Sequence, residues 1–116
     1  MHCMSDVYNF DSFPGAVTIC TPEGIIEYMN SAAETLLASH GGRALIGSNV
    51  LDCHPTAARE KLEGLMRDRR SNTYTSEKNG IRRLVYQFPL YDNGGYSGYG
   101  EISFEIPFVI PNFVRE

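Results

Sequence analysis

Two Asn-Gly turns near the C-terminal end are the strongest constraint on what this chain can fold into. They lie at 78–80 (Lys-Asn-Gly) and 92–95 (Asp-Asn-Gly-Gly), and the segments around them are rich in β-branched and aromatic residues. Asn-Gly pairs adopt the backbone that closes a tight antiparallel hairpin. The pattern predicts three consecutive antiparallel strands, over about 71–77, 81–91 and 96–106.

A further hairpin is predicted near the start of the chain. The apolar run AVTIC at 16–20 and the run IIEYM at 25–29 are separated by the turn sequence TPEG. Both runs have the residue types of strands, and Gly24 ends the turn between them. The sequence therefore predicts strands at both ends of the chain, with a different pattern between them.

The middle of the chain carries helix signals. Ser31, followed by Glu34 three residues later, forms the pattern of a capping box, which predicts a helix start. The glycine-punctuated segment 43–53 predicts short, irregular helical turns. His54-Pro55 then opens the strongest helical pattern, because proline costs no hydrogen bond at the first position of a helix. Apolar residues follow at helical spacing, namely Ala58, Leu62, Leu65 and Met66.

Length and composition limit the possible classes of protein. A chain of 116 residues, 42% of them hydrophobic, is long enough for one domain. Its net charge of −4 gives no electrostatic reason to expect nucleic acid or a membrane surface as a partner. Cys3, Cys20 and Cys53 are an odd number without metal-ligand spacing, and no apolar leader precedes them, which predicts reduced thiols and no metal site. We therefore expect a soluble, cytoplasmic protein.

The order of these elements and the residues at their corners resemble the PAS domain family of sensor modules. The resemblance rests on TPEGIIEYMNSAAETLL, LIGSNVLDCHP and EKNGIRRLVYQFPLYDNGGYSGYGEISFEI. It implies an α+β fold, a PAS-like five-stranded antiparallel sheet with helices packed on one face and a pocket between them. The ending EIPFVIPNFVRE is similar to that of short stand-alone PAS proteins. We accordingly expect an N-terminal flap or short helix at 1–14, a PAS domain at 15–107 and an apolar tail at 108–116.

In function, the resemblance implies a non-enzymatic sensory module that binds a small organic ligand and signals through protein contacts. A ligand-free module for protein interaction or dimerisation is an alternative. PAS sensors normally report to an effector domain in the same chain, so a separate effector protein is expected if these residues are the whole gene product. A small cone-shaped α+β enzyme, with Asp52 and Glu101 as acid-base carboxylates, is a further alternative, although solvation at the surface explains both carboxylates more simply.

The predicted pocket follows from laying the strands on the PAS pattern. Alternation along 83–88 separates Arg83, Val85 and Gln87 from their neighbours, and the alternation alone leaves open which set faces inward. The resemblance places this set inward, where Arg83 would bridge to a protein carboxylate or bind an anionic ligand. The other residues that it places in the pocket are Val50, Leu51, His54, Leu62, Thr73, Thr75, Gly100, Ile102 and Phe104.

Haem and flavin are the two cofactors that the PAS resemblance raises. The segment CHPTAARE resembles haem-binding PAS sensors, in which a histidine early in the long helix binds iron, and His54 stands at that position. A helix-capping role for His54 is the simpler alternative. Light-sensing PAS domains carry a cysteine directly after the asparagine of Gly-x-Asn-Cys, whereas GSNV here has Val50. The cofactor stays unknown, with haem possible and flavin disfavoured.

The opposite face of the predicted sheet is aromatic. Such a patch is too large to stay exposed on a stable monomer, so we expect a homodimer through it, with the chain termini involved. The residues assigned to this dimer or partner face are Phe10, Tyr74, Leu84, Tyr86, Phe88, Tyr99, Phe108 and Phe113.

Overall fold

The computed structural model describes residues 10–116, with the backbone alone for Cys53. Most of the predicted flap at 1–14 therefore lies outside the described residues. Ten elements follow the short 3₁₀ turn η2 (Phe10–Ser12), and they are β1 (Ala16–Cys20), β2 (Ile26–Met29), α1 (Ser31–Leu36), η3 (Ala38–His40), η4 (Gly42–Leu45), η5 (Val50–Cys53), α2 (Thr56–Asp68), β3 (Asn72–Lys78), β4 (Ile81–Asp92) and β5 (Gly95–Ile106).

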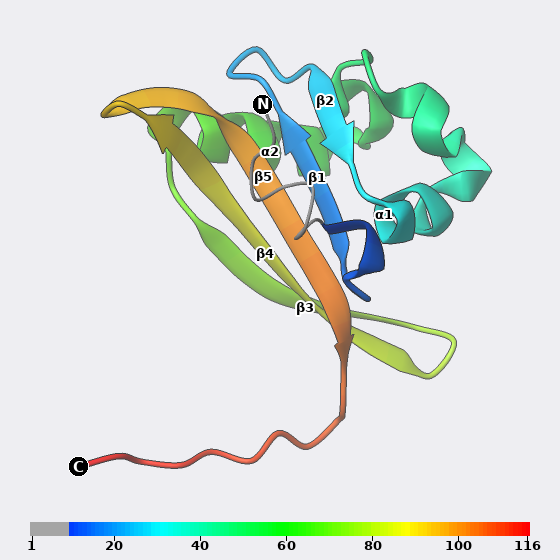
Figure 1. The fold of residues 1–116 in the computed structure, drawn as a ribbon, viewed down its shortest axis with the longest axis vertical. Helices are drawn as coiled ribbons and strands as arrows, with labels where there is room; N and C mark the ends of the chain where they lie inside the picture. The colour runs from blue at the N-terminus through cyan, green and yellow to red at the C-terminus, as the bar shows by residue number, and fades with distance from the viewer. Residues whose placement is uncertain (1–9) are drawn as a thin grey trace, which may run out of the picture.

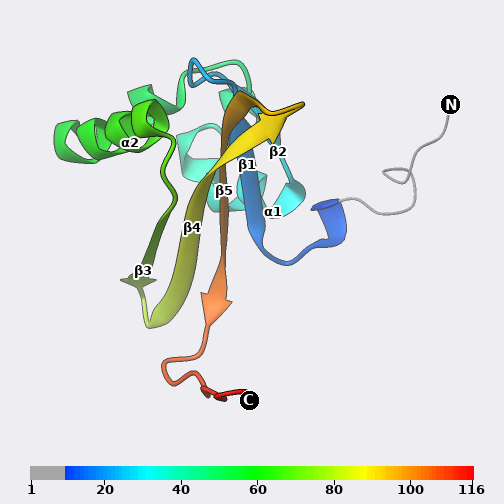
Figure 2. The same cartoon turned by 90° about the vertical axis from the view of Figure 1, so that its left-hand side faces the viewer.

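The five strands form one antiparallel sheet in the order β2-β1-β5-β4-β3. The last strand, β5, lies in the middle, so the N-terminal hairpin and the C-terminal strands meet there. Figure 1 shows α2 crossing behind the sheet and α1 beside β2, and Figure 2 shows the sheet nearly edge-on with α2 on one side. The predicted fold class, a five-stranded antiparallel sheet with helices, is confirmed.

Both predicted Asn-Gly turns are confirmed by their backbone. Asn79 and Gly80 have φ of 54° and 78°, and Asn93 and Gly94 have φ of 51° and 80°. Two successive residues with positive φ match the right-handed twist of the strands that they join. The sequence therefore sets the register of β3 on β4 and of β4 on β5 through local turn chemistry.

The start of α1 corrects the predicted capping box. Asn30, not Ser31, is the N-cap, and its side-chain Oδ1 accepts a hydrogen bond from Ala33 N at 3.0 Å. Glu34 does not reach back to the cap, because its carboxylate forms an ion pair with Arg43 at 3.0 Å. The helix begins where predicted, but one residue earlier supplies the capping oxygen.

Asn30 also joins three parts of the chain in the core. Its Oδ1 accepts a further hydrogen bond from Val17 N at 2.9 Å, and its Nδ2 donates to the carbonyls of Phe10 at 2.8 Å and Gly15 at 2.9 Å. Its exposed fraction is 0%. A fully buried amide is tolerated here because every donor and acceptor site of the side chain has a partner.

Helix α2 packs its predicted apolar side against the sheet. Leu62, Leu65 and Met66 are buried in one cluster with Cys20 and Tyr99, whereas Ala58 is exposed. Pro55 is the N-cap of this helix rather than its first helical residue. Leu62, Leu65 and Met66 thus form one part of the core with residues of the strands β1 and β5.

The strand register decides which side chains face the helices. Val85 and Gln87 face them, as expected, and so do their partners Ser103 and Glu101 on β5. The predicted inward placement of Thr73, Thr75, Ile102 and Phe104 is wrong for their side-chain directions. Thr73 and Ile102 both pair with Tyr86, and Thr75 and Phe104 both pair with Leu84, which puts them on the opposite face from Val85 and Gln87. A shift of one residue in register moves a whole strand to the other face.

The same register corrects the predicted partner face. Leu84, Tyr86 and Phe88 lie on the sheet face away from the helices, as expected, but Tyr74 and Tyr99 do not. Tyr99 is buried against α2, and Tyr74 pairs with Val85 on the helical side. We call the face away from the helices the outer face, and it carries Leu84, Tyr86, Phe88, Ile102 and Phe104.

Candidate ligand pocket between helices and sheet

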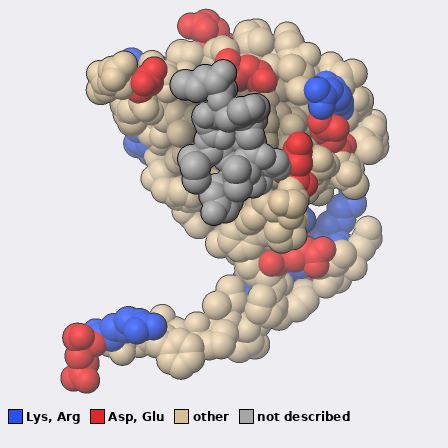
Figure 3. Space-filling model, viewed as in Figure 1, with Lys and Arg blue, Asp and Glu red and all other residues tan. Residues whose placement is uncertain are grey.

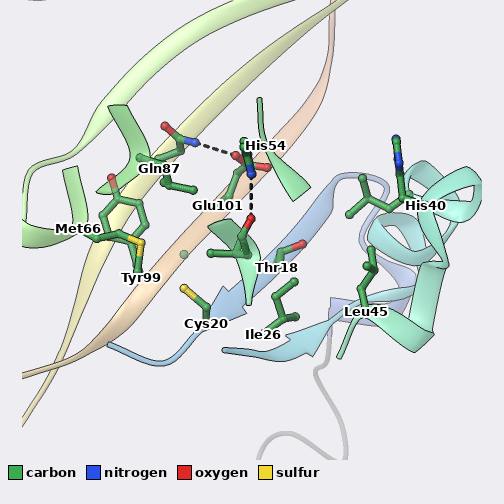
Figure 4. A pocket seen from close by; sticks show the side chains of 14 residues that line it. Thr18, Cys20, Ile26, His40, Leu45, His54, Met66, Gln87, Tyr99 and Glu101 are labelled. Atoms are coloured by element: carbon green, nitrogen blue, oxygen red, sulfur yellow. Dashed lines mark hydrogen bonds between the residues drawn. The ribbon is translucent and has the colours of Figure 1, made fainter. Parts of the chain in front are cut away.

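A cavity of about 190 Å³ lies between the sheet and the helical segments. Strands β1, β4 and β5 form one wall, the loop and 3₁₀ segments between α1 and α2 form another, and α2 covers one end (Figure 4). Its lining residues are Thr18, Cys20, Ile26, Leu37, His40, Leu45, Val50, His54, Leu62, Met66, Gln87, Tyr99, Gly100 and Glu101. The lining is mostly apolar, with a few polar side chains, which is the usual character of a small-molecule site.

The polar side chains form a row across four strands. Thr18 is the cross-strand partner of Glu101, Glu101 of Gln87, and Gln87 of Asn72. Asn72 Nδ2 donates to Gln87 Oε1 at 3.0 Å, and Gln87 Nε2 donates to Glu101 Oε1 at 2.9 Å, the second bond being drawn in Figure 4. Both amides donate in the direction of Glu101. The hydrogen-bonded part of the row, from Asn72 to Glu101, therefore ends in a carboxylate acceptor at the pocket.

His54 adds a second acceptor. Its ring Nδ1 lies 2.8 Å from the Val50 carbonyl oxygen, which can only accept, so Nδ1 carries the proton. In the neutral ring Nε2 is then unprotonated. The bond from Nδ1 to Val50 is drawn in Figure 4. This contact links the start of the α2 segment to η5 and fixes the tautomer of a ring that lines the cavity.

The opposite part of the wall is apolar and holds two buried ionisable groups in their neutral forms. Burial raises the pKa of the Cys20 thiol to about 11 and that of the Tyr99 phenol to about 12. The Tyr99 hydroxyl donates to the Arg70 carbonyl at 2.8 Å, which holds the ring against α2. Both groups are therefore uncharged near neutral pH and contribute apolar surface to the pocket.

Five residues predicted for the pocket line it, namely Val50, His54, Leu62, Gln87 and Gly100, the last without a side chain. Leu51 instead lines a separate hollow beside α2, and Val85 is buried on the helical side without lining the cavity. Arg83 donates to Ser103 Oγ at 2.8 Å and lines a different hollow near Phe104, so its predicted contact with an anionic ligand is not supported by its position.

The sequence reasoning missed most of the cavity wall. Glu101 was interpreted as a solvated surface carboxylate, whereas it is half-buried and lines the pocket. Alternation along Ala16–Cys20 groups Thr18 with Cys20 on one face of β1. Only the β1-β5 register shows that this face lines the cavity. The missed lining residues are Thr18, Cys20, Ile26, Leu37, His40, Leu45, Met66, Tyr99 and Glu101.

Acid-base catalysis by Asp52 and Glu101, the other chemistry that the sequence raised, has no support in the geometry. Asp52 lies at the surface, where its carboxylate is 3.4 Å from Arg59, and it is not in the lining of the cavity with Glu101. Within residues 10–116, no group of three or more His, Cys, Asp or Glu side chains is placed to hold a metal ion. Over the same residues, no helix is both long and apolar enough to cross a membrane.

The comparisons with known proteins decide the family. The sequence profile described as "PAS fold" matches residues 10–69, which is more than half of the chain. The chain belongs to the PAS fold family. This family comprises sensory and signal-transduction domains. No curated protein sequence matches the chain.

Solved structures show the same fold at low sequence identity. A C-terminal domain from Streptococcus mutans is 22% identical with a TM-score of 0.66, over 83% of this chain and 78% of that one. The Aer2 receptor of Vibrio cholerae, described as a dual PAS-haem oxygen sensor, is 20% identical with a TM-score of 0.59, over 80% and 95%. The VqmA dimer of Vibrio cholerae is 14% identical with a TM-score of 0.67, over 92% of this chain and 52% of that one.

Haem does not fit the cavity as it stands. An apolar cavity of about 150 Å³ holds benzene, so the 190 Å³ here suits one small ring rather than a macrocycle of four pyrroles. The orientation of His54 leaves Nε2 available as a ligand, but Glu101 and Gln87 occupy the sheet wall of the same space. The residues present therefore match a compact, partly polar ligand better than haem.

Proposed function

We propose that this PAS domain is a non-enzymatic sensor that binds a small organic ligand between its helices and sheet and passes the signal on through protein contacts. The observation that supports this most directly is the cavity itself. It combines apolar walls with the Glu101 carboxylate, which accepts a hydrogen bond from Gln87 at the end of the polar row. A cavity that served packing alone would have no use for a carboxylate with so few partners. Ligand binding would shift the balance between arrangements of the sheet and its extensions.

The related structures support the fold and leave the ligand open. One is described as a haem oxygen sensor, and another as a dimeric receptor that binds DNA. Since these proteins share the fold and differ in what they do, function follows from the pocket residues of each chain. The proposal for this chain accordingly rests on its own lining residues.

A test is a fragment screen by protein-observed NMR on the full chain. We expect single-ring compounds to shift the backbone amides of Thr18, Gln87 and Glu101, which lie on three different strands around the cavity. A matched variant, Leu62→Trp, fills the pocket from α2, and it should abolish these shifts while the remaining spectrum stays dispersed. A screen in which no compound perturbs the wild-type lining would contradict ligand binding and favour the ligand-free interaction module.

For the protein contact, we propose a homodimer through the outer face. Tyr86 stacks on Phe88 with ring centroids 5.3 Å apart, and Tyr86 and Phe104 remain 43% and 37% exposed. Charged side chains lie scattered and mixed on the part of this face that Figure 3 shows, without a patch of one sign. Such a surface favours an apolar partner over a polyanion.

The C-terminal segment supports a second copy as that partner. It leaves β5 after Ile106 and runs away from the sheet (Figures 1 and 2), held near its start by the bond from Arg82 Nη1 to the Phe108 carbonyl at 3.3 Å. Val109, Phe113 and Val114 are 83%, 79% and 89% exposed. Apolar side chains that find no cover on their own sheet can bury area on the outer face of another copy, at roughly 25 cal/mol per Å².

Light scattering after gel filtration tests the dimer. We expect the wild-type mass to be that of a dimer, and Tyr86→Arg to shift it to a monomer because the charge would be buried against apolar groups. Tyr91→Arg is the matched control, since Tyr91 is an exposed aromatic residue outside the outer face. A wild-type monomer at all concentrations would contradict the proposal.

Haem binding is the second candidate function that the sequence raised, and an absorption spectrum would test it directly. The absorption spectrum of freshly purified protein would show a Soret band if haem were bound, and His54→Ala would remove it. Given the size of the cavity, we expect no such band. A band lost in His54→Ala would replace the small-ligand proposal with a haem sensor.

A further inference from the structure

The pocket has an unequal balance of hydrogen-bonding groups and charges, and this balance has consequences for its ligand. Among the described residues, the only ionisable carboxyl group in the lining is Glu101, and no Lys or Arg lines the cavity. Lys61 borders an adjacent hollow between α2 and β3 and is not in the lining of this cavity. The field inside the cavity therefore disfavours an anion and favours a cation or a neutral donor.

Glu101 keeps most of its acceptor capacity. An ionised carboxylate has about four acceptor positions, whereas Gln87 Nε2 is the one hydrogen-bond donor to this side chain among the described residues. The Gln87 amide is held in this orientation from both sides. Its Oε1 accepts from Asn72 Nδ2, which leaves Nε2 to donate to the Glu101 carboxylate. Glu101 thus presents free acceptor positions and no donor to a ligand.

His54 presents an acceptor as well. Its Nδ1–H donates to the Val50 carbonyl oxygen, and Nε2 of the neutral ring has no partner among the described residues. Two acceptors on different walls, one on β5 and one before α2, line the same cavity (Figure 4). A ligand that satisfies both has to carry at least two hydrogen-bond donors.

Size and apolar lining set the rest of the ligand. A cavity of 190 Å³ exceeds the roughly 150 Å³ that holds benzene by about one small substituent. Cys20, Leu62, Met66 and Tyr99 supply apolar surface at one end of the cavity. A single aromatic or aliphatic ring would bury its carbon atoms there and direct its polar groups to Glu101.

We propose, resting on the ligand-binding function above, that the pocket selects a single-ring compound that is neutral or positively charged and carries at least two N–H or O–H donors. Glu101 is the group that sets this specificity. The ligand is thus a cyclic amine, an amidine or a hydroxylated or amino-substituted heterocycle, and not a carboxylate or phosphate.

Three probes of nearly equal shape and different charge test this selection on the full chain. They are benzamidine, benzamide and benzoate, titrated at neutral pH and followed through the amide shifts of the lining residues. We expect benzamidine to bind about tenfold or more tightly than benzamide, because a hydrogen bond between two charged groups is stronger than one to a neutral donor. Benzoate should show no binding.

Variants assign the selectivity to its source. Glu101→Gln keeps an acceptor for Gln87 and removes the charge, and it should weaken benzamidine binding about tenfold or more while benzamide changes less. Glu105→Gln is the matched control, since it removes the same charge from the same strand at an exposed position and should change affinity by less than about twofold. His54→Leu should weaken both donor probes, and Lys61→Gln neither.

The outcomes separate the two proposals. Benzoate binding as well as benzamidine, or an unchanged benzamidine affinity in Glu101→Gln, would overturn the donor preference and leave ligand binding intact. No perturbation of the lining by any of the three probes would overturn both. A loss of benzoate binding in Lys61→Gln would assign an anion site to the adjacent hollow and equally overturn the selection proposed here.

Discussion

Asn30 and Glu101 are both polar side chains inside the fold, and they differ in how completely they are satisfied. The Asn30 amide is fully buried and makes four hydrogen bonds, all to backbone groups of η2, β1, α1 and the residue before β1. The Glu101 carboxylate is half-buried and accepts one, from Gln87. The first is a closed network and the second an open one.

We interpret this difference as one of role, with Asn30 stabilising the fold and Glu101 kept available for the proposed ligand. A closed network adds stability and uniqueness, because removing it leaves backbone groups without partners. An open network adds little stability and leaves capacity for a ligand, which is a usual property of functional sites. Mutation tests this difference, since replacing Asn30 should lower the free energy of unfolding strongly and replacing Glu101 should change it little.

The largest effect is expected at Asn30. Asn30→Ala would leave the Val17 and Ala33 amides and the Phe10 and Gly15 carbonyls without their partner, at about 1–3 kcal/mol for each group that water cannot reach. We expect the free energy of unfolding in urea to fall by at least about 3 kcal/mol.

The control is Asn49→Ala, which removes a partly exposed cap. Asn49 Oδ1 accepts from Leu51 N at 2.9 Å at the start of η5, so its loss should cost about 1 kcal/mol. Equal losses at both asparagines would show that the closed network has no special weight.

Alkaline pH should have a moderate effect through the apolar wall of the pocket. The pKa of Cys20 is raised from 9.0 to about 11, so its contribution to stability is fully present below pH 9.0 and is lost as the pH rises through 11. The loss for this group is about 2 kcal/mol. Urea unfolding at pH 8 and pH 11, compared between wild type and Cys20→Ala, isolates it. An identical pH slope in the two proteins would contradict a buried, neutral thiol.

The smallest effect on stability is expected at Glu101. Glu101→Gln retains an acceptor for Gln87 and removes a partly buried charge, so the free energy of unfolding should change by less than about 1 kcal/mol, or rise. Thermal or urea unfolding measures it beside the loss of benzamidine affinity. A destabilisation as large as that of Asn30→Ala would place Glu101 in the closed class and weaken its assignment to the ligand.

Prediction from the sequence succeeded where the signal is local. The Asn-Gly turns and the spacing of Leu62, Leu65 and Met66 identified the C-terminal strands and the long helix, since each depends on residues a few positions apart. The cap of α1 was predicted one residue late, because Ser31 has the right residue type and Asn30 has the better position. The family resemblance supplied the single five-stranded antiparallel sheet with helices on one face, which the residue pattern alone does not contain.

The candidate site was predicted less completely, for a physical reason that Thr73 and Glu101 illustrate. Alternation tells which residues of one strand share a face, but an error of one residue in pairing exchanges the faces, and this happened on β3 and β5. Glu101 carries no local sign of burial, since an acidic residue in a strand is usually solvated.

What the sequence by itself determined about this protein is its set of elements, its turn geometry and its family, because these follow from chemistry between near neighbours in the chain. The tertiary structure alone decided which polar side chains share the pocket. Thr18, Gln87 and Glu101 are separated by 69 and 14 residues along the chain and become neighbours through the β1-β5 and β4-β5 pairings. Their charge balance, from which we propose the ligand class, exists only once that register has formed.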